Sequence, residues 1–215
     1  MASGHKELLE QQKFHTIKAG LQQYRLDDFI RNLENKKGKN RGSILPFIRG
    51  LRFSSLLIYA IRELLTGSGL TANWGHIIDE DGELCSRECD IIIHKDGYIM
   101  RWNGDGGLHP VMDFKFIEQT EALAVISCKS YLQHKSHIEV EYCEDLKKYV
   151  DKVWLFAECC PPEKATEIRE KAVEVGYECF WHLYAWDKDK SSVEDSLNDW
   201  TDFVQKIKDL KNIIR

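Results

Sequence analysis

Two short apolar runs near the middle of the chain each carry a charged residue at one end. Asp90–Ile93 begins with an acid and continues with three isoleucines, whereas Ala122–Ile126 is apolar throughout and leads to Lys129. Apolar runs of this length are typical of strands at the centre of a sheet. A charge buried alone costs several kcal/mol. We therefore expect Asp90 and Lys129 to share a solvated edge of the sheet, or to pair with each other or with a metal ion.

The order of these residues resembles the site motif of the PD-(D/E)XK nuclease superfamily, in which an acid and a spacer precede acid-x-lysine at the end of the next strand. Asp90 matches the first acid and Lys129 the lysine, while Ser127 stands where the second acid is expected. The resemblance covers about Ile48–Ala157 and includes the glycine-containing strand Trp74–Ile78. It implies an α/β fold of the restriction-endonuclease-like kind, with a mixed central sheet flanked by helices. The helical N- and C-terminal extensions that we also expect lie outside the resemblance.

The resemblance also implies a site for Mg²⁺, or for Mn²⁺ in its place. Asp90 would be the principal metal ligand and the backbone carbonyl of Cys128 the second. Magnesium takes one or two protein carboxylates and fills its other positions with water and phosphate. Lys129 is expected to position or deprotonate a water molecule and to stabilise charge on the phosphate, with the neutral hydroxyl of Ser127 beside it.

A replacement for the missing second acid is expected on the helix that follows Lys129. Some type II restriction endonucleases resemble this arrangement, because they have serine-x-lysine on the strand and take a carboxylate from the next helix. Glu141 and Glu144 bracket that spacing and are therefore candidate metal ligands, on a helix that we expect Ser136 to cap. The alternative is that acids near a helix N-terminus simply complement its dipole.

A second acid-x-lysine sequence, Asp113-Phe114-Lys115, competes with the motif that ends at Lys129. Its flanks alternate between polar and apolar residues, which predicts an edge strand over Val111–Ile117. The run that leads to Lys129 is apolar throughout, as a central strand requires. We therefore place the site lysine at position 129.

The preceding helix lacks an acid that many members of the superfamily use to hold metal. Pro46 leads into an apolar helix predicted over Phe47–Leu65, but the region expected to carry the acid, Gly50–Ser55, has none. Glu63, near the helix end, is only a weak substitute. Since two expected carboxylates are missing, a degenerate nuclease fold that binds nucleic acid or a protein without cutting stays open as an alternative.

Basic residues are concentrated in one acid-free stretch between Asn35 and Arg62. The flexible, glycine-broken start of this stretch is a candidate nucleic-acid contact, because basic side chains and helix-terminal N–H groups bind phosphates. Its candidate residues are Lys36, Lys37, Lys39 and Arg41. A merely solvated run of charges is the alternative.

Composition limits the class of protein. The chain has 215 residues, of which 43% are hydrophobic, and a net charge of −5, so a nucleic-acid contact needs a local basic surface. Its seven cysteines show no CxxC pair, which argues against a zinc ribbon. Their odd number and the lack of a secretory signal favour reduced thiols in a cytoplasmic protein. No apolar run reaches membrane-spanning length, so we expect no membrane contact.

The length favours one α/β core with helical extensions. We expect an N-terminal helix and basic loop over residues 1–47, a nuclease-like core over residues 48–190 and a C-terminal helix over residues 191–215. Ser191 and Glu194 have the spacing of a capping box at the start of that last helix. Its apolar stripe predicts packing on the core or on a second subunit, so a homodimer is an open alternative.

Together with the family resemblance, these patterns favour a Mg²⁺-dependent endodeoxyribonuclease of a restriction or defence system, with DNA as its partner. The degenerate nuclease fold described above is the main alternative. A purely structural interaction protein is the third interpretation, since both terminal helices are amphipathic and the net charge is acidic.

Overall fold

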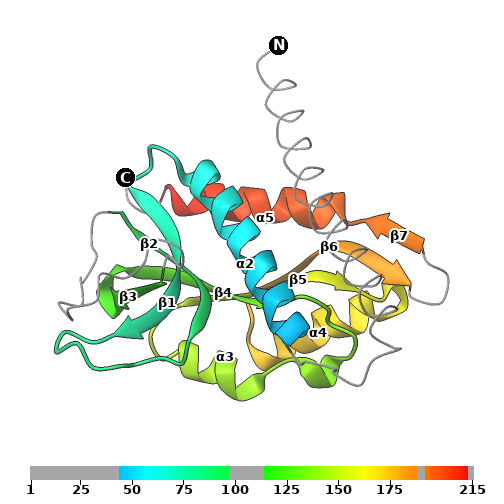
Figure 1. Ribbon diagram of the computed structural model, residues 1–215, viewed down its shortest axis with the longest axis horizontal. Coiled ribbons are helices and arrows are strands. Elements are labelled where there is room, and N and C mark those ends of the chain that lie inside the picture. The colour runs from blue at the N-terminus through cyan, green and yellow to red at the C-terminus, as the bar shows by residue number, and fades with distance from the viewer. Residues whose placement is uncertain (1–43, 97–113, 188–191, 213–215) are drawn as a thin grey trace, which may run out of the picture.

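The computed structural model describes residues 44–96, 114–187 and 192–212 of the chain (Figure 1). In this part of the chain a seven-stranded mixed sheet runs in the order β3-β1-β2-β4-β5-β6-β7. Its strands are β1 Leu70–Ile78, β2 Cys89–Lys95, β3 Phe114–Glu118, β4 Ala122–Lys129, β5 Lys152–Cys160, β6 Cys179–Asp187 and β7 Ser192–Asp195. The helices are α2 Ile44–Leu65, α3 Val140–Leu146, α4 Ala165–Val175 and α5 Leu197–Leu210, with short 3₁₀ turns at Gln119–Glu121, Lys135–His137 and Pro162–Lys164.

The sheet combines parallel and antiparallel pairs. Strand β1 is parallel to β3 and antiparallel to β2, β2 is antiparallel to β4, and β4, β5 and β6 are mutually parallel before β7 closes the edge antiparallel to β6. The predicted α/β fold with a mixed central sheet flanked by helices is confirmed. The predicted edge strand is confirmed as well, since β3 lies at one end of the sheet.

Each face of the sheet carries its own hydrophobic core. Helices α2 and α5 pack on one face, where Phe53, Phe156 and Phe203 are fully buried. Helices α3 and α4 pack on the other face, over a cluster that includes Ile92 and Val125. Burial on both faces explains why the central strand β4 is apolar from Ala122 to Ile126. None of the helices in the described residues combines the length and the apolar character needed to cross a bilayer.

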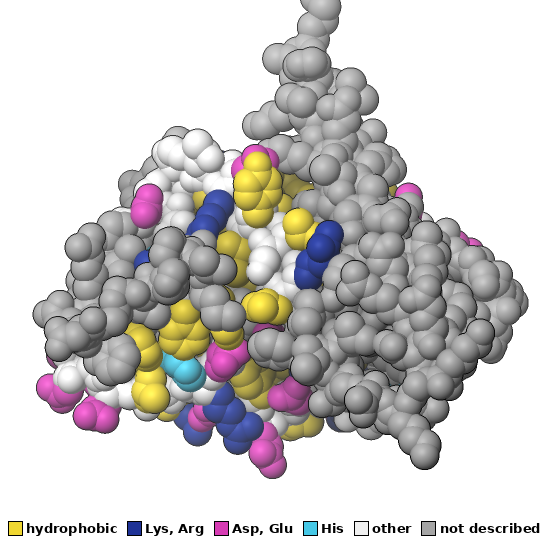
Figure 2. Space-filling view, viewed as in Figure 1, with side chains coloured by type: hydrophobic (Ala, Val, Ile, Leu, Met, Phe, Trp, Pro, Cys, Tyr) yellow, Lys and Arg dark blue, Asp and Glu magenta, His cyan; other side chains and the backbone are white. Residues whose placement is uncertain are grey.

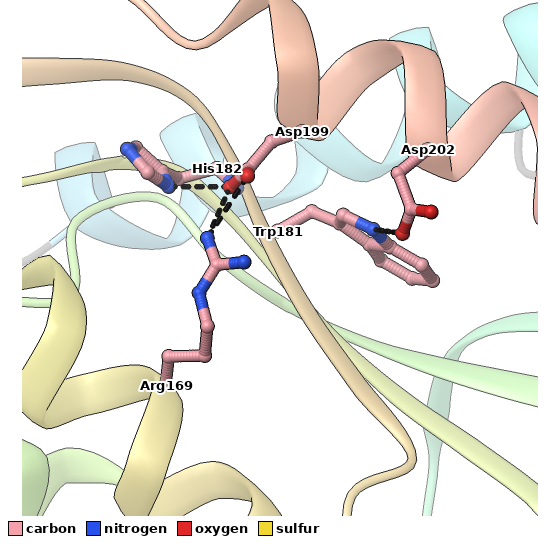
Figure 3. Close-up of polar contacts among 5 residues, drawn as sticks. All are labelled: Arg169, Trp181, His182, Asp199 and Asp202. Atoms are coloured by element: carbon pink, nitrogen blue, oxygen red, sulfur yellow. Dashed lines mark hydrogen bonds and ion pairs between the residues drawn. The ribbon is translucent and has the colours of Figure 1, made fainter.

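A polar cluster fixes the start of α5 to its neighbours (Figure 3). The Asp199 carboxylate on α5 accepts hydrogen bonds from the Arg169 guanidinium on α4 at 2.9 and 3.0 Å and from the backbone N–H of His182 on β6 at 3.0 Å. The His182 Nδ1 atom lies 2.7 Å from the same carboxylate. These contacts connect helices from opposite faces of the sheet through β6, so α5 is an integral part of the core.

Two predicted helix starts are wrong. Ser136 does not cap a helix, because it lies in a 3₁₀ turn and α3 begins only at Val140. The capping box with Glu194 does not form, since Glu194 lies in β7 and pairs with Ala185, and α5 begins at Leu197. Ser136 is part of the 3₁₀ turn instead, and Glu194 forms backbone pairing in β7 instead of capping a helix. The predicted N-terminal helix lies outside the described residues.

Gly75 allows β3 to pair with β1. A Cβ atom at this position would lie 1.8 Å from the backbone carbonyl oxygen of Lys115, which is far inside van der Waals contact. The pairing register places Gly75 opposite Lys115, next to a register shift between Asn73 and Gly75 in the pairing with β2. The close approach of two backbones therefore requires glycine here.

Gly75→Ala is expected to lower the free energy of unfolding by about 2 kcal/mol or more, because backbone atoms of β3 must move to admit the methyl group. Urea denaturation measures this change. Gly50→Ala is the control, since a Cβ at Gly50 in α2 meets nothing within 4 Å. That control should stabilise the protein by about 0.5–1 kcal/mol. A Gly75→Ala variant as stable as the wild type would contradict the pairing of β1 with β3.

Candidate active site

Asp90 is tied by a hydrogen bond to the strand that carries Lys129. It lies in the first two residues of β2, next to the paired residues Ile91 and Ile126 of β2 and β4. The backbone N–H of Cys128 donates to Oδ2 of Asp90 at 2.7 Å, and within the described part of the chain no other hydrogen bond reaches this carboxyl group. The predicted placement of the acid and the lysine on neighbouring strands is thus confirmed.

The surroundings of Asp90 oppose its ionisation. Burial raises the pKa of Asp90 from 3.8 to about 6, although the Cys128 N–H and the charge of Lys129 favour the ionised form. The negative charges of Glu88 and Glu139 raise the pKa further. The charges of Glu88 and Glu139 thus oppose the ionisation of Asp90, and a cation placed there would relieve the repulsion among these carboxylates.

The carboxylate that contacts Lys129 belongs to Glu139. The Lys129 ammonium forms an ion pair with Oε1 of Glu139, and the two side chains are 26% and 52% exposed. Glu139 precedes the first turn of α3, and its backbone carbonyl accepts a hydrogen bond from the Tyr177 hydroxyl at 3.4 Å. Glu139 was not among the acids selected from the sequence, because the expected spacing after Lys129 favoured Glu141 and Glu144.

Ser127, two residues before Lys129 on β4, is buried in the protein interior. Its side chain is 1% exposed, and it interacts with the hydroxyl of Tyr177, which also contacts Glu139. Ser127 and Lys129 are two residues apart on β4, so their side chains leave the strand on the same face. The motif position that normally holds an acid is therefore occupied here by the buried hydroxyl of Ser127.

Glu141 and Glu144, the acids favoured by spacing, face solvent on α3. The Glu141 side chain is 87% exposed and lies 3.9 Å from the Arg87 guanidinium. Glu144 is also exposed. The described contacts of these two acids do not extend to Asp90 or Lys129. The structure thus brings together Asp90, Ser127, Cys128, Lys129 and Glu139, and leaves Glu141 and Glu144 on the outer face of the helix.

The remaining sequence candidates lie elsewhere. Lys115 of the competing motif is on the edge strand β3, with β1 and β2 between it and β4, and Asp113 is outside the described residues. Glu63 lies in the last turn of α2, near the start of β1. Also outside the described residues are the basic candidates Lys36, Lys37, Lys39 and Arg41. In Figure 2, the described surface beside α2 mixes basic, acidic and apolar side chains and shows no continuous basic area.

The donor groups around Asp90 fit a hard divalent cation. The described residues contain no group of three His, Cys, Asp or Glu side chains placed to hold a metal ion. Mg²⁺ does not need such a group, because it binds through one or two carboxylates and keeps several waters or phosphate oxygens. Asp90, whose Oδ1 takes no hydrogen bond in the described part of the chain, and the nearby Glu139 supply oxygen ligands of this kind.

By sequence, no protein-family model and no curated protein matches the chain. Solved structures do resemble its fold. NucC of P. aeruginosa ATCC27853 in its cAAA-bound form superposes with a TM-score of 0.62 at 11% identity, over 96% of this chain and 90% of that one. NucC of E. coli MS115-1 gives a TM-score of 0.63 at 10% identity over the same shares in its cAAA-bound form. In its apo form the score is 0.55 at 8% identity, over 76% of this chain and 84% of that one.

The chain shares the fold of NucC. The likeness extends over 96% of the chain. At 10% or 11% identity it establishes the fold and transfers no residue role. The chemistry of the site must therefore be argued from the side chains of this chain.

The raised pKa of Asp90 predicts that stability depends on pH in a defined direction. The folded protein keeps this proton up to about pH 6, whereas the unfolded chain loses it near pH 4, so the contribution is complete below pH 4 and is lost as pH rises through 6. In metal-free buffer, Asp90→Asn should therefore stabilise the protein by about 1–3 kcal/mol at pH 8 and by much less at pH 4.

Urea denaturation at both pH values measures this difference. The asparagine amide oxygen still accepts the Cys128 N–H, so the hydrogen bond is preserved. Glu144→Gln, which removes one negative charge from an exposed position of α3, is the control for the change of charge. An Asp90→Asn effect that is the same at pH 4 and pH 8 would show that ionised Asp90 is not disfavoured in the fold.

Proposed function

We propose that this protein is a metal-dependent nuclease that hydrolyses phosphodiester bonds in DNA, with Mg²⁺ or Mn²⁺ as cofactor, in a defence or restriction system. One observation carries the proposal. Asp90 and Lys129 flank the Cys128 backbone at the meeting point of two central strands, in a fold similar to that of NucC. An acid and a lysine are needed together where a metal and a phosphate must be bound side by side.

The residues of the site have separate tasks in this proposal. Asp90 would bind the cation while the Cys128 N–H fixes its Oδ2, and the Cys128 carbonyl would supply a second oxygen ligand. Lys129 would hold the phosphate or the attacking water, with Ser127 as a neutral neighbour. The cation, when bound, polarises the phosphate and makes a water molecule more acidic. From spacing alone, Glu141 and Glu144 are the candidates for a second acidic ligand.

The nuclease proposal predicts cleavage of plasmid DNA by the full chain in the presence of Mg²⁺ or Mn²⁺, and none with a chelator. Lys129→Ala and Asp90→Ala should each lower the rate at least about 100-fold, because each removes charge that stabilises the transition state. Lys148→Ala is a control, since Lys148 pairs with Asp145 on the surface of the same region. Cleavage that survives both site variants would contradict this assignment.

DNA binding is proposed to depend on the basic stretch before α2. Replacing Lys36, Lys37, Lys39 and Arg41 together by alanine should weaken binding to any DNA sequence and flatten its dependence on salt, because fewer counterions are released. Fluorescence anisotropy over a salt series measures both quantities. If the salt dependence of DNA affinity is unchanged in this variant, the stretch is a solvated linker that does not contact DNA.

A catalytically degenerate binder of nucleic acid is the second candidate, favoured by the buried Ser127 in place of an acid. It predicts DNA binding without cleavage in the wild type. If Ser127→Glu then created activity that the native protein lacks, the degenerate fold would be the better account. NucC has been solved with cAAA bound, and these forms superpose over more of this chain than the apo form does. A cAAA-dependent rise in melting temperature or in cleavage would place the chain among nucleotide-responsive nucleases.

A further inference from the structure

We infer that Glu139 supplies the carboxylate missing at position 127, and that its ion pair with Lys129 is a metal-free arrangement which a divalent cation opens. The inference rests on the proposed nuclease function of this site. It assigns a metal-binding role to an acid that the spacing argument did not select, and it gives Lys129 two partners in succession.

The first argument is the rigidity of the segment that carries Glu139. After Lys129 the chain is anchored by the fully buried Leu132, whose N–H donates to the Cys159 carbonyl at 3.0 Å. Ile138 is 5% exposed and fixes the other end of the loop. The Glu139 carbonyl then accepts hydrogen bonds from the Cys143 N–H at 3.3 Å and from the Tyr177 hydroxyl at 3.4 Å. The chain thus returns to Lys129 through fixed contacts, so the backbone of Glu139 has a defined position.

The second argument is that Tyr177 contacts both Glu139 and Ser127, the residue at the position where the motif has its second acid. Its hydroxyl interacts with the Ser127 side chain and donates to the Glu139 carbonyl, so both residues lie around one phenol group. A carboxylate on Ser127 would project from β4 on the same face as Lys129. Glu139, at the start of α3, forms an ion pair with that same lysine.

The third argument comes from the partners of the neighbouring acids. Glu88 accepts a hydrogen bond from the Trp74 indole at 2.8 Å, and Glu141 faces Arg87 at 3.9 Å. Glu139, by contrast, pairs with Lys129 itself. Asp90 accepts the Cys128 N–H, and Lys129 is the next residue, so consecutive residues of β4 contact the two carboxylates. Asp90 and Glu139 therefore form the pair of acids between which a hard cation is best accommodated.

The ion pair implies competition between Lys129 and the cation. An ammonium group and a divalent ion cannot share the same carboxylate oxygens without repelling each other, and the ion carries the larger charge. A cation held by Glu139 would take this carboxylate from Lys129 and leave the Lys129 ammonium available to a phosphate. Without metal, the ammonium stays paired with Glu139.

Binding of Mn²⁺ alone to the full chain, measured by isothermal titration calorimetry, tests the inference without relying on activity. Glu139→Gln and Asp90→Asn should each weaken Mn²⁺ binding about 10-fold or more. Glu144→Gln tests the candidate chosen by spacing, and Glu170→Gln, at an exposed acid of α4, is the control that should leave binding close to wild type. Lys129→Ala should tighten binding in the wild-type background and have a smaller effect when combined with Glu139→Gln. Thermal unfolding of each variant without metal confirms that it is folded.

The outcomes separate this inference from the nuclease proposal. If the wild type cleaves DNA but Glu139→Gln keeps full Mn²⁺ affinity, the inference is overturned and the nuclease proposal stands. If Glu139→Gln loses Mn²⁺ affinity but the wild type never cleaves DNA, the inference stands and the nuclease proposal fails. Equal losses in Glu139→Gln and Glu144→Gln would overturn the specific role of Glu139, and a wild type that binds no Mn²⁺ at all would overturn both.

Discussion

The hydrogen bond from the Cys128 N–H to the Asp90 carboxylate is the interaction on which the site depends. It joins the second residue of β2 to the end of β4. It holds the Asp90 carboxyl group in place although the charges of Glu88 and Glu139 oppose its ionisation. Because the donor is a backbone group between Ser127 and Lys129, the same contact fixes the acid relative to the lysine. The sheet is thus the scaffold, and strand pairing sets the geometry of the candidate chemistry.

This arrangement reduces the stability of the fold at the site. Ionised Asp90 is disfavoured where it lies, and the buried Ser127 contributes no charge that would hold a metal. Two hydrophobic cores, together with the contacts of Asp199 with α4 and β6, stabilise the rest of the fold and offset this loss of stability. A destabilised polar centre on a rigid support is common at functional sites, because perturbed carboxyl groups are what metal and phosphate chemistry uses.

The central strands could be predicted from the sequence because burial on both faces leaves a continuous apolar run, as in Ala122–Ile126. The adjacency of Asp90 and Lys129 followed from the same reasoning. The role of Glu139 could not be predicted, since it depends on the 3₁₀ turn Lys135–His137, which delays the start of α3 and rotates its acids. Strand β7 was missed for a similar reason, because its edge pairing with β6 outweighs the local capping signal at Glu194.

The central claim is that Asp90 and the Cys128 backbone form a divalent-metal site. Anomalous diffraction from crystals of the full chain soaked in Mn²⁺ tests it most directly. We expect one strong peak within about 2–2.5 Å of Asp90 Oδ1 and of the Cys128 carbonyl oxygen. A peak confined to another acidic region, such as the pocket lined by Asp79, Asp81 and Glu118, would contradict the account. So would the absence of any peak near Asp90 at saturating Mn²⁺.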